Sequence, residues 1–132
     1  MPYALIGGVA MAFYSAPRFT KDIDIIVKKG DLKNVCNILG RKGYMKSAQP
    51  WIFKETKLTL HRFLKVADED EMLIDVLVAG NARIEKMIDH AEVAESKGTG
   101  QIRVIRRKDL IWLKKARNSK LDQADVEAIQ HE

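Results

Sequence analysis

The sequence predicts a single α/β domain in which strands and helices alternate along the chain. Its 132 residues are enough for one substantial hydrophobic core but too few for two domains. Hydrophobic residues make up 46% of the chain and charged residues 31%, which is the composition of an ordinary globular protein. The third observation is the pattern of hydrophobic residues along the chain. Short apolar or alternating runs are followed by segments with helical spacing, without repeats or a linker.

The first half of this domain is predicted to contain two strands and two helices. Residues 3–6 are a short apolar run typical of a buried strand, and residues 8–15 form a short helix before Pro17. Residues 22–27 alternate Asp-Ile-Asp-Ile before an apolar end, which indicates a strand with one functional face. Asp31 is placed to cap a second helix. Its apolar positions and the glycines that close it are Leu32, Val35, Cys36, Leu39, Gly40 and Gly43.

The middle of the chain is predicted to be β structure. Residues 51–53, 58–66 and 72–78 are rich in β-branched and aromatic residues. The acidic run 68–71 falls between the last two strands, so we expect it to form a hairpin tip. A solvated turn and a cation site are both open interpretations of this run.

The last part of the chain is predicted to be mostly helical. Asn81 is placed to cap a helix that continues to about residue 97 and ends at residues 98–100. The remaining expected elements are a short strand at 102–105 and two helices at 108–116 and 122–130.

Positive charge is concentrated near the C-terminus. The chain carries a net charge of +5, and the segment from Arg103 to Lys120 contains eight basic residues against Asp109 alone. That segment therefore carries +7 and the rest of the chain about −2. A local basic stretch suits a polyanion such as a nucleoside triphosphate or a nucleic acid, although each residue taken singly fits a solvated helix face equally well.

Cysteine usage and hydropathy indicate an intracellular protein. Cys36 is the only cysteine, so no disulfide forms within the chain, and its apolar helical setting favours a core residue over a nucleophile. No signal peptide is expected, and the longest mostly apolar run, residues 3–13, is too short to span a bilayer. The cytoplasm is therefore the expected location, with no membrane partner.

Asp22 and Asp24 are the first candidates for chemistry. Because they lie two residues apart on a predicted strand, their side chains share one face, with about 6–7 Å between the Cα atoms. Two bare carboxylates this close repel each other unless a cation lies between them. Mg²⁺ suits this position, since it binds through a few carboxylates together with substrate phosphates. Two such ions can activate an attacking hydroxyl and neutralise departing pyrophosphate.

Asp75 is the candidate third carboxylate. It interrupts the otherwise apolar run Leu73-Ile-Asp-Val-Leu-Val78, where a charge is unfavourable unless it is paired or bound to a metal. Two interpretations are open. One is a salt bridge to a buried arginine or lysine, and the other is a metal-binding triad with Asp22 and Asp24, which requires the two strands to be neighbours.

Gly7 and Gly8 lie where the first strand turns into the first helix. Glycine permits a positive φ and a close approach between backbone and ligand, and the helix that begins there presents its positive end to a phosphate. The pair lacks the GxGxxG and P-loop fingerprints, and taken alone it is a tight turn. Arg18 and Lys21, just before the carboxylates, are candidates for steering phosphates or plain surface charges.

These residues together resemble a known motif. Gly7-Gly8 followed by Asp22-Ile-Asp24 is similar to the hG[GS]…DxD motif of the DNA polymerase β-like nucleotidyltransferase superfamily. The string from residue 5 to residue 24 resembles the small bacterial and archaeal members, including the AbiEii-type toxins. The tail from residue 113 to residue 126 resembles their C-terminal Lys…Arg-x-Lys-Asp-x-x-Asp segment, so the likeness covers nearly the whole chain.

The resemblance implies a nucleotidyltransferase fold, in which a mixed β-sheet is flanked by helices and NTP and Mg²⁺ bind at the sheet edge. It implies that Gly7 and Gly8 contact the phosphates. It also implies that Asp22 and Asp24 hold two Mg²⁺ ions, for which Mn²⁺ can substitute. Asp75 matches the third carboxylate of the metal site, which orients or deprotonates the acceptor hydroxyl.

The basic tail is expected to neutralise the triphosphate of the bound NTP. Lys120 is the first candidate on the family pattern, with Lys114 and Arg117 as further ones. Helix capping and a local ion pair are the alternative for Lys120 and Asp122. The second glycine, Gly8, stands where many members carry serine, so a hydroxyl contact to phosphate is absent.

The expected activity is transfer of an NMP from an NTP to a hydroxyl acceptor on a protein, a tRNA or a small molecule. A toxin role with a cognate antitoxin is compatible with the family. The chain starts directly before Tyr3, without the helix that usually precedes the first strand in the family. A partner or a homodimer is therefore expected to complete the acceptor site. The alternative function is a non-catalytic module that keeps the fold and binds nucleic acid or protein through the basic tail.

Overall fold

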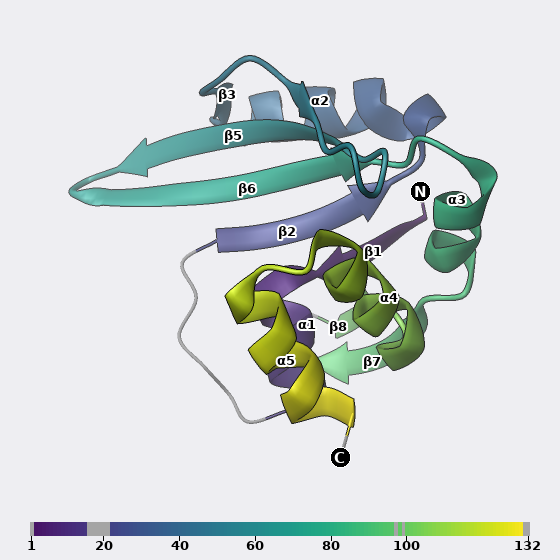
Figure 1. The fold of residues 1–132 in the computed structure, drawn as a ribbon. Helices are drawn as coiled ribbons and strands as arrows, with labels where there is room; N and C mark the ends of the chain where they lie inside the picture. The colour runs from purple at the N-terminus through teal and green to yellow at the C-terminus, as the bar shows by residue number, and fades with distance from the viewer. Residues whose placement is uncertain (1, 16–21, 97, 99, 131–132) are drawn as a thin grey trace.

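The computed structural model describes residues 2–15, 22–96, 98 and 100–130. Within these residues the chain forms one mixed sheet of eight strands with helices packed on it, which confirms the predicted class (Figure 1). The strands are β1 (Tyr3–Ile6), β2 (Asp22–Val27), β3 (Met45–Lys46), β4 (Trp51–Ile52), β5 (Thr59–Ala67), β6 (Asp70–Val78), β7 (Glu92–Ser96) and β8 (Gly100–Val104). The helices are α1 (Gly7–Tyr14), α2 (Leu32–Arg41), α3 (Ala82–Asp89), α4 (Arg107–Arg117) and α5 (Lys120–Gln130), with a 3-10 turn at Lys29–Asp31.

The strand order is β3-β5-β6-β2-β1-β8-β7, and β4 pairs with β5 beside this path. β2 lies at the centre, antiparallel to β1 and parallel to β6. The register places Ile6, the last residue of β1, opposite Asp24 of β2. As a result, the point where β1 turns into α1 lies beside the Asp-x-Asp pair.

The β5–β6 hairpin confirms the predicted turn at the acidic run. The two strands pair from Thr59↔Val78 to Ala67↔Asp70, which leaves Asp68 and Glu69 at the tip. Asp68 has a φ of 58°, a left-handed conformation that aspartate tolerates better than most residues.

The helix predicted from Asn81 to about residue 97 is half as long as expected. Asn81 does cap it, because its side chain accepts a hydrogen bond from the Ile84 amide at 3.0 Å. The helix ends at Asp89, however, and residues 92–96 form β7, which pairs with β8 at the edge of the sheet. Pairing with β8, the next strand along the chain, overrides the local helical spacing here, because a segment with helical spacing can still become a strand when a partner strand lies alongside it.

Asp31 occupies the predicted N-cap position of α2 without acting as a cap. Its side chain makes no capping hydrogen bond, since the preceding 3-10 turn already gives Asp31 helical dihedral angles. A capping side chain normally belongs to a residue with non-helical angles.

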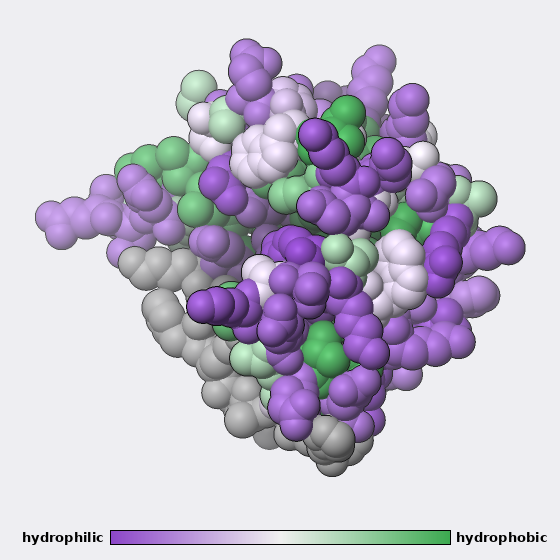
Figure 2. Space-filling view, viewed as in Figure 1, coloured by the Kyte–Doolittle hydropathy of each residue, from purple (hydrophilic) through white to green (hydrophobic). Residues whose placement is uncertain are grey.

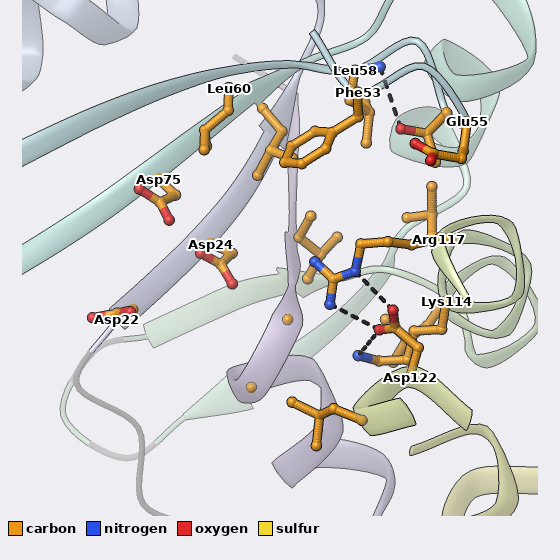
Figure 3. A pocket seen from close by; sticks show the side chains of 18 of the residues that line it. Asp22, Asp24, Phe53, Glu55, Leu58, Leu60, Asp75, Lys114, Arg117 and Asp122 are labelled. Carbon is orange, nitrogen blue, oxygen red and sulfur yellow. Dashed lines mark hydrogen bonds and ion pairs between the residues drawn. The ribbon is translucent and has the colours of Figure 1, made fainter. Parts of the chain in front are cut away.

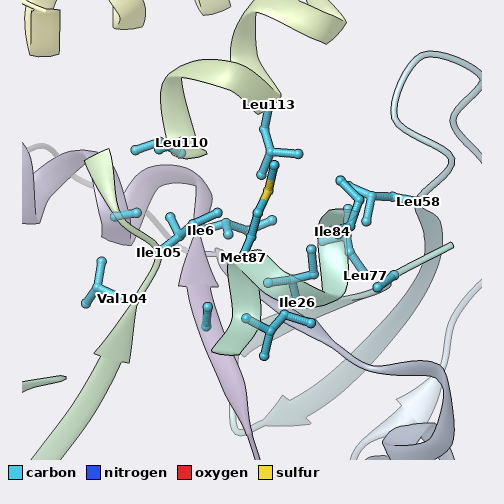
Figure 4. Packing of buried hydrophobic residues seen from close by; sticks show 14 of the residues in the cluster. Ile6, Ile26, Leu58, Leu77, Ile84, Met87, Val104, Ile105, Leu110 and Leu113 are labelled. Atoms are coloured by element: carbon cyan, nitrogen blue, oxygen red, sulfur yellow. The ribbon is translucent and has the colours of Figure 1, made fainter. Parts of the chain in front are cut away.

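The two faces of the sheet bury separate hydrophobic clusters. On one face, Val35 and Leu39 of α2 pack against strand residues such as Phe63 and Val76, with Cys36 half-buried beside them. On the other face, a larger cluster joins the sheet to α1, α3, α4 and α5. Figure 4 shows its centre, where Ile26, Ile84, Met87, Leu110 and Leu113 come together.

The larger cluster ends where the candidate carboxylates begin. Side chains alternate along a strand, so Ile26 and Asp24 share a face of β2, as do Leu77 and Asp75 of β6. Ile26 is fully buried, whereas Asp24 is half-buried. The core therefore supports the floor of the site directly.

Tyr14 fixes the far end of α1. Its hydroxyl donates a hydrogen bond to the Ile105 carbonyl oxygen at 2.7 Å, across the junction between β8 and α4. Burial, reinforced by the Glu92 carboxylate, raises the pKa of Tyr14 to about 12. The hydroxyl therefore stays protonated and keeps donating across the whole neutral range.

None of the helices in the described part of the chain combines the length and apolar character that a membrane crossing requires.

Candidate active site

Three carboxylates gather on one face of the sheet. β2 and β6 run parallel, and their register places Asp24 opposite Asp75, with Asp22 two residues before Asp24. Residues opposite one another on neighbouring strands point to the same face, as do residues two apart on one strand. Figure 3 shows all three side chains on the same side of the sheet. The strand neighbourhood on which the sequence-based triad depended is present.

Gly7 brings backbone directly against this group. It is the first residue of α1 and has a φ of +66°. A Cβ at this position would overlap the Asp24 Oδ2 atom, so another residue would have to displace the carboxylate as well as adopt a strained backbone. The N-cap residue, Ile6, makes no side-chain capping bond. The amides of the first turn of α1 therefore have no side-chain cap, which is the condition that suits an anion.

Asp24 is the carboxyl that this crowding affects most. Burial raises the pKa of Asp24 to about 6, and the neighbouring carboxylates of Asp75 and Asp22 add to the increase. The guanidinium groups of Arg117 and Arg62 act in the opposite direction without cancelling it. A bound cation beside these carboxylates would favour the ionised form of Asp24 and lower its pKa again.

Arg62 of β5 holds Asp75 in a bidentate ion pair. Its Nε donates to Oδ1 at 2.8 Å and its Nη2 donates to Oδ2 at 3.0 Å. The Asp75 side chain is 9% exposed and that of Arg62 is 37% exposed. The Arg62 guanidinium also lies 5.6 Å from the centre of the Trp51 ring. Asp75 thus forms a salt bridge, as one interpretation of the sequence predicted, and it also lies beside Asp24.

The C-terminal helices form the opposite wall. Arg117 donates from Nε and Nη2 to the two Asp122 oxygens, both at 2.8 Å, and Lys114 Nζ donates to Asp125 at 2.8 Å. Burial alone would raise the pKa of Asp122, but hydrogen bonds from Arg117 and Ser119 bring it well below its usual range. Figure 3 shows the Arg117 and Lys114 side chains across the open space from the carboxylates of β2. Two cations are therefore fixed in position by carboxylates of α5.

A pocket of about 550 Å³ lies between these walls. Its polar lining consists of the groups described above together with Glu55 and Thr56, and the remaining lining is apolar or aromatic. The apolar lining comprises Ile6, Trp51, Phe53, Leu58, Leu60, Leu77, Leu110, Leu113 and Leu121. A few charged groups set in largely apolar walls are typical of a small-molecule site.

Most of the residues predicted from the sequence line this pocket. They are Gly7, Gly8, Asp22, Asp24, Asp75 and Lys114, together with Arg117. Arg18 and Lys21 lie outside the described residues. Lys120, the first residue of α5, is exposed and does not line the pocket.

Asp122 follows the alternative interpretation of capping and a local ion pair. Its amide donates to Ser119 Oγ at 3.1 Å while the Ser119 amide donates to the Asp122 carboxylate at 3.1 Å, which is a capping box at the start of α5. It also pairs with Arg117. The S-x-x-D pattern of residues 119–122 is the sequence signal from which this capping box can be recognised.

Arg62 and the aromatic wall were not identified from the sequence. Nothing in the sequence distinguishes Arg62 from other strand arginines until the β5–β6 register places it opposite Asp75. Trp51 and Phe53 were predicted to be strand residues. Their place beside the carboxylates depends on β4 folding back onto β5.

The donor chemistry suits a hard divalent cation held jointly with a ligand. Within the described residues, no three His, Cys, Asp or Glu side chains are grouped so that they could hold a metal ion by themselves. Mg²⁺ commonly binds through one or two carboxylates and takes its other ligands from water and substrate phosphates. Asp22 and Asp24, with Asp75 beside them, fit Mg²⁺ that arrives with a polyphosphate.

Comparison with known proteins identifies the fold. No family model and no curated protein matches the sequence. The structure of a lincosamide antibiotic adenylyltransferase with bound lincomycin is similar, with a TM-score of 0.53 and 14% identity over 97% of this chain and 85% of the other. A proposed nucleotidyltransferase from Thermotoga maritima is similar with a TM-score of 0.61 and 14% identity, over 93% of this chain and 79% of the other. This chain therefore has the nucleotidyltransferase fold, as the sequence resemblance implied.

Proposed function

We propose that this chain is a metal-dependent nucleotidyltransferase that transfers an NMP from an NTP to a hydroxyl acceptor. The acceptor oxygen forms a bond to the α-phosphorus, the bond from that phosphorus to the bridging oxygen breaks, and pyrophosphate leaves. One observation carries the proposal. Asp24 lies opposite Asp75 in the sheet and directly against the Gly7 turn, so a carboxylate group and a phosphate-compatible helix start share one pocket.

Asp22 and Asp24 would hold the divalent metal, Mg²⁺ or Mn²⁺, with Asp75 as the third carboxylate. When bound, the metal would neutralise charge on the phosphates and on the departing pyrophosphate and activate the acceptor hydroxyl. The chain itself supplies the Gly7–Gly8 turn, where the absence of side chains lets the triphosphate approach the backbone amides of α1.

Asp75 is the group proposed to take the proton of the acceptor hydroxyl. Its two oxygens each accept one hydrogen bond from Arg62, which leaves a second lone pair on each oxygen to accept a proton from the substrate. The forked guanidinium would meanwhile hold the carboxylate in a fixed orientation. Arg62 is therefore a positioning residue for Asp75 in this proposal.

Lys114 and Arg117 are proposed to balance the charge of the triphosphate. Both line the pocket from α4, and their ion pairs with α5 fix them there before a ligand arrives. Cations that are already oriented lose little conformational freedom on binding, so their electrostatic contribution is realised more fully. Lys120 keeps only a peripheral role here, because it is exposed outside the pocket lining.

The apolar wall is proposed to contact the planar base of the NTP or the body of the acceptor. Trp51 and Phe53 form an aromatic pair with ring centres 6.1 Å apart, and both line the pocket. Aromatic faces of this kind stack on nucleobases without a strong preference for one base. The NTP preference is therefore expected to be broad unless the acceptor occupies this wall.

Calorimetric titration with each NTP, in the presence and absence of Mg²⁺, tests the proposal. We expect metal-dependent binding to the wild type and its loss in Asp22→Asn/Asp24→Asn. The matched control is Asp68→Asn/Asp70→Asn, which removes two exposed carboxylates at the same spacing from the hairpin tip and should bind as the wild type does. A folded wild-type protein that binds no NTP would overturn the proposal.

Transfer is then measured with an α-labelled form of the NTP that binds. Label that becomes attached to a protein, a tRNA or a small hydroxyl compound identifies the acceptor class. The Asp75→Asn variant should attach no label to the acceptor. If Asp75 serves mainly as the proton acceptor, this variant should still bind the NTP. Equal transfer by wild type and Asp75→Asn would contradict the role given to that residue.

A further inference from the structure

A second hollow, of about 380 Å³, lies between α3 and the beginning of α4 and is separate from the active-site pocket. We call it the α3–α4 groove. Its lining residues are Arg83, Lys86, Met87, His90, Arg106, Lys108, Asp109 and Trp112. Figure 2 shows a mostly hydrophilic surface over these two helices, at the right of the view. Four cations face one carboxylate in this lining.

Three of these cations have no carboxylate partner within the described residues. Arg106 is paired with Asp109, whose Oδ2 accepts hydrogen bonds from the guanidinium at 2.9 and 3.0 Å. No ion pair among the described residues involves Arg83, Lys86 or Lys108, and all three are exposed. The groove therefore concentrates about three uncompensated positive charges, which attract a ligand that carries several negative charges.

Arg83 also presents a flat surface. Its guanidinium lies 4.4 Å from the centre of the Trp112 ring, within the range of a cation–π contact. Trp112 is half-buried and packs against the larger hydrophobic cluster, so the ring is fixed and holds the guanidinium in place. Bases of unpaired nucleotides stack on arginine planes as well as on aromatic rings.

The basic stretch seen in the sequence is divided by the fold between different tasks. Arg103 is structural, since it donates to the Tyr3 and Ile88 carbonyl oxygens at 2.9 and 2.7 Å. Lys114 and Arg117 belong to the active-site pocket, whereas Lys108 lies in the groove. The groove also recruits Arg83 and Lys86 of α3, which lie outside that stretch. The positive charge of the groove therefore comes from two helices that the fold brings together, and not from the basic stretch of the sequence alone.

We propose that the α3–α4 groove binds single-stranded nucleic acid. Backbone phosphates contact Arg83, Lys86 and Lys108, and one base stacks on the Arg83 guanidinium above Trp112. A charged groove combined with a stacking plane is the usual arrangement for single strands. A duplex conceals the faces of its bases, and an acidic polypeptide has no flat bases to stack, so the observations favour a single strand. The inference is independent of the nucleotidyltransferase proposal, because the two hollows share no lining residue.

Filter binding of labelled single-stranded RNA and DNA of about ten nucleotides, over a series of salt concentrations, tests the inference. If three cations contact phosphates, a plot of log K against log salt concentration should have a slope of about −2. The double variant Arg83→Glu/Lys86→Glu should lose at least about tenfold in affinity. Lys33→Glu/Lys42→Glu changes the net charge equally on exposed lysines in and next to α2, away from the groove, and should lose much less.

Arg83→Lys separates stacking from charge. It keeps the positive charge and the salt slope but removes the plane, so we expect affinity to fall at least about fivefold, as for the loss of one stacked base. Asp22→Asn/Asp24→Asn should bind the strand as the wild type does, which keeps this test distinct from that of the nucleotide site. Thermal melting of each variant confirms that it is folded.

Several results would overturn the inference. These are no binding by the wild type, equal losses in the groove variant and the α2 variant, or wild-type affinity in Arg83→Lys. Equal competition by duplex or by polyglutamate would also overturn it, in favour of a general polyanion surface.

Discussion

At the scale of single residues, the site depends on glycine at position 7, because a larger side chain would not fit there. Gly7 has a positive φ and lies so close to Asp24 that a methyl group would overlap the carboxylate. Two separate requirements, backbone conformation and space, therefore fall on the same position. Gly8 also lines the pocket, so the turn as a whole presents backbone rather than side chains to a ligand.

Gly7→Ala should be destabilised and should lose NTP binding. The left-handed conformation alone disfavours alanine by about 1 kcal/mol, and displacement of Asp24 adds to this. Urea denaturation measures the loss in free energy of unfolding. The control is Gly40→Ala in α2, where nothing lies within 4 Å of an added Cβ, and which should be stabilised by about 0.5–1 kcal/mol. Equal stability of Gly7→Ala and wild type would contradict the crowding seen at Asp24.

Asp24 should make the metal-free protein less stable near neutral pH. Its folded pKa of about 6 lies above its ordinary value, so the folded state holds this proton more tightly than the unfolded state. Stability from this group is therefore complete in acid and is lost as the pH rises through about 6. Asp24→Asn removes the titration. We expect it to match the wild type near pH 4 and to exceed its free energy of unfolding near pH 7 by at most about 3 kcal/mol.

Chemical denaturation of both proteins across this pH range measures the effect. The exposed Asp70→Asn variant is the control and should follow the wild type at every pH. A difference between Asp24→Asn and wild type that does not grow between about pH 4 and pH 7 would contradict the assigned pKa.

At the scale of elements, local patterns predicted most boundaries and failed where a partner strand decides the conformation. β1 and β2 match their predicted ranges, because apolar runs between clear turns need little tertiary information. The region after Asp89 has helical spacing, yet it becomes β7 because β8 offers it a pairing edge. Gly98 and Gly100, which lie between these strands and at the start of β8, both have a positive φ, which glycine adopts without steric cost.

The caps of α2 and α3 provide a matched test at this scale. Asn81→Ala should reduce the free energy of unfolding by about 1 kcal/mol, because it removes the hydrogen bond to the Ile84 amide. Asp31→Ala at the corresponding position of α2 should change stability by less than about 0.5 kcal/mol, since no capping bond exists there. Thermal denaturation compares the two, and a larger loss for Asp31→Ala would show that the cap assignment is reversed.

At the scale of the whole molecule, the pocket is assembled from segments that are far apart in the sequence. Asp22, Asp24 and the glycine turn were predictable because each belongs to one short motif. Asp75 was predictable as an anomaly in an apolar strand, but its partner Arg62 emerged only from the strand register. Lys120 was favoured by the family pattern, whereas the fold directs Lys114 and Arg117 into the pocket instead. Short sequence motifs thus predicted the central residues of the candidate site, whereas the residues around them could be identified only from the arrangement of strands and helices.

A ligand that joins these segments should stabilise the entire fold. With Mg²⁺ and an NTP at about one hundred times the dissociation constant, the free energy of unfolding should rise by about 2.7 kcal/mol. Thermal melting with and without both components measures this gain, and neither component alone should reproduce it. Asp22→Asn/Asp24→Asn should show no gain, whereas Asp68→Asn/Asp70→Asn should show the full shift. An equal shift in all three proteins would place the bound nucleotide elsewhere.

Each of the two hollows is lined by one of the two tryptophans of this chain, so tryptophan fluorescence can report on each hollow separately. Trp51 lies beneath Arg62 in the candidate active-site pocket, and Trp112 lies beneath Arg83 in the α3–α4 groove. Since the sequence contains no other indole, Trp51→Phe leaves tryptophan emission that comes from the groove alone. Trp112→Phe leaves one that comes from the pocket. Quenching by a nucleotide and quenching by a single strand can therefore be recorded separately, one in each variant, without attaching a dye to the protein.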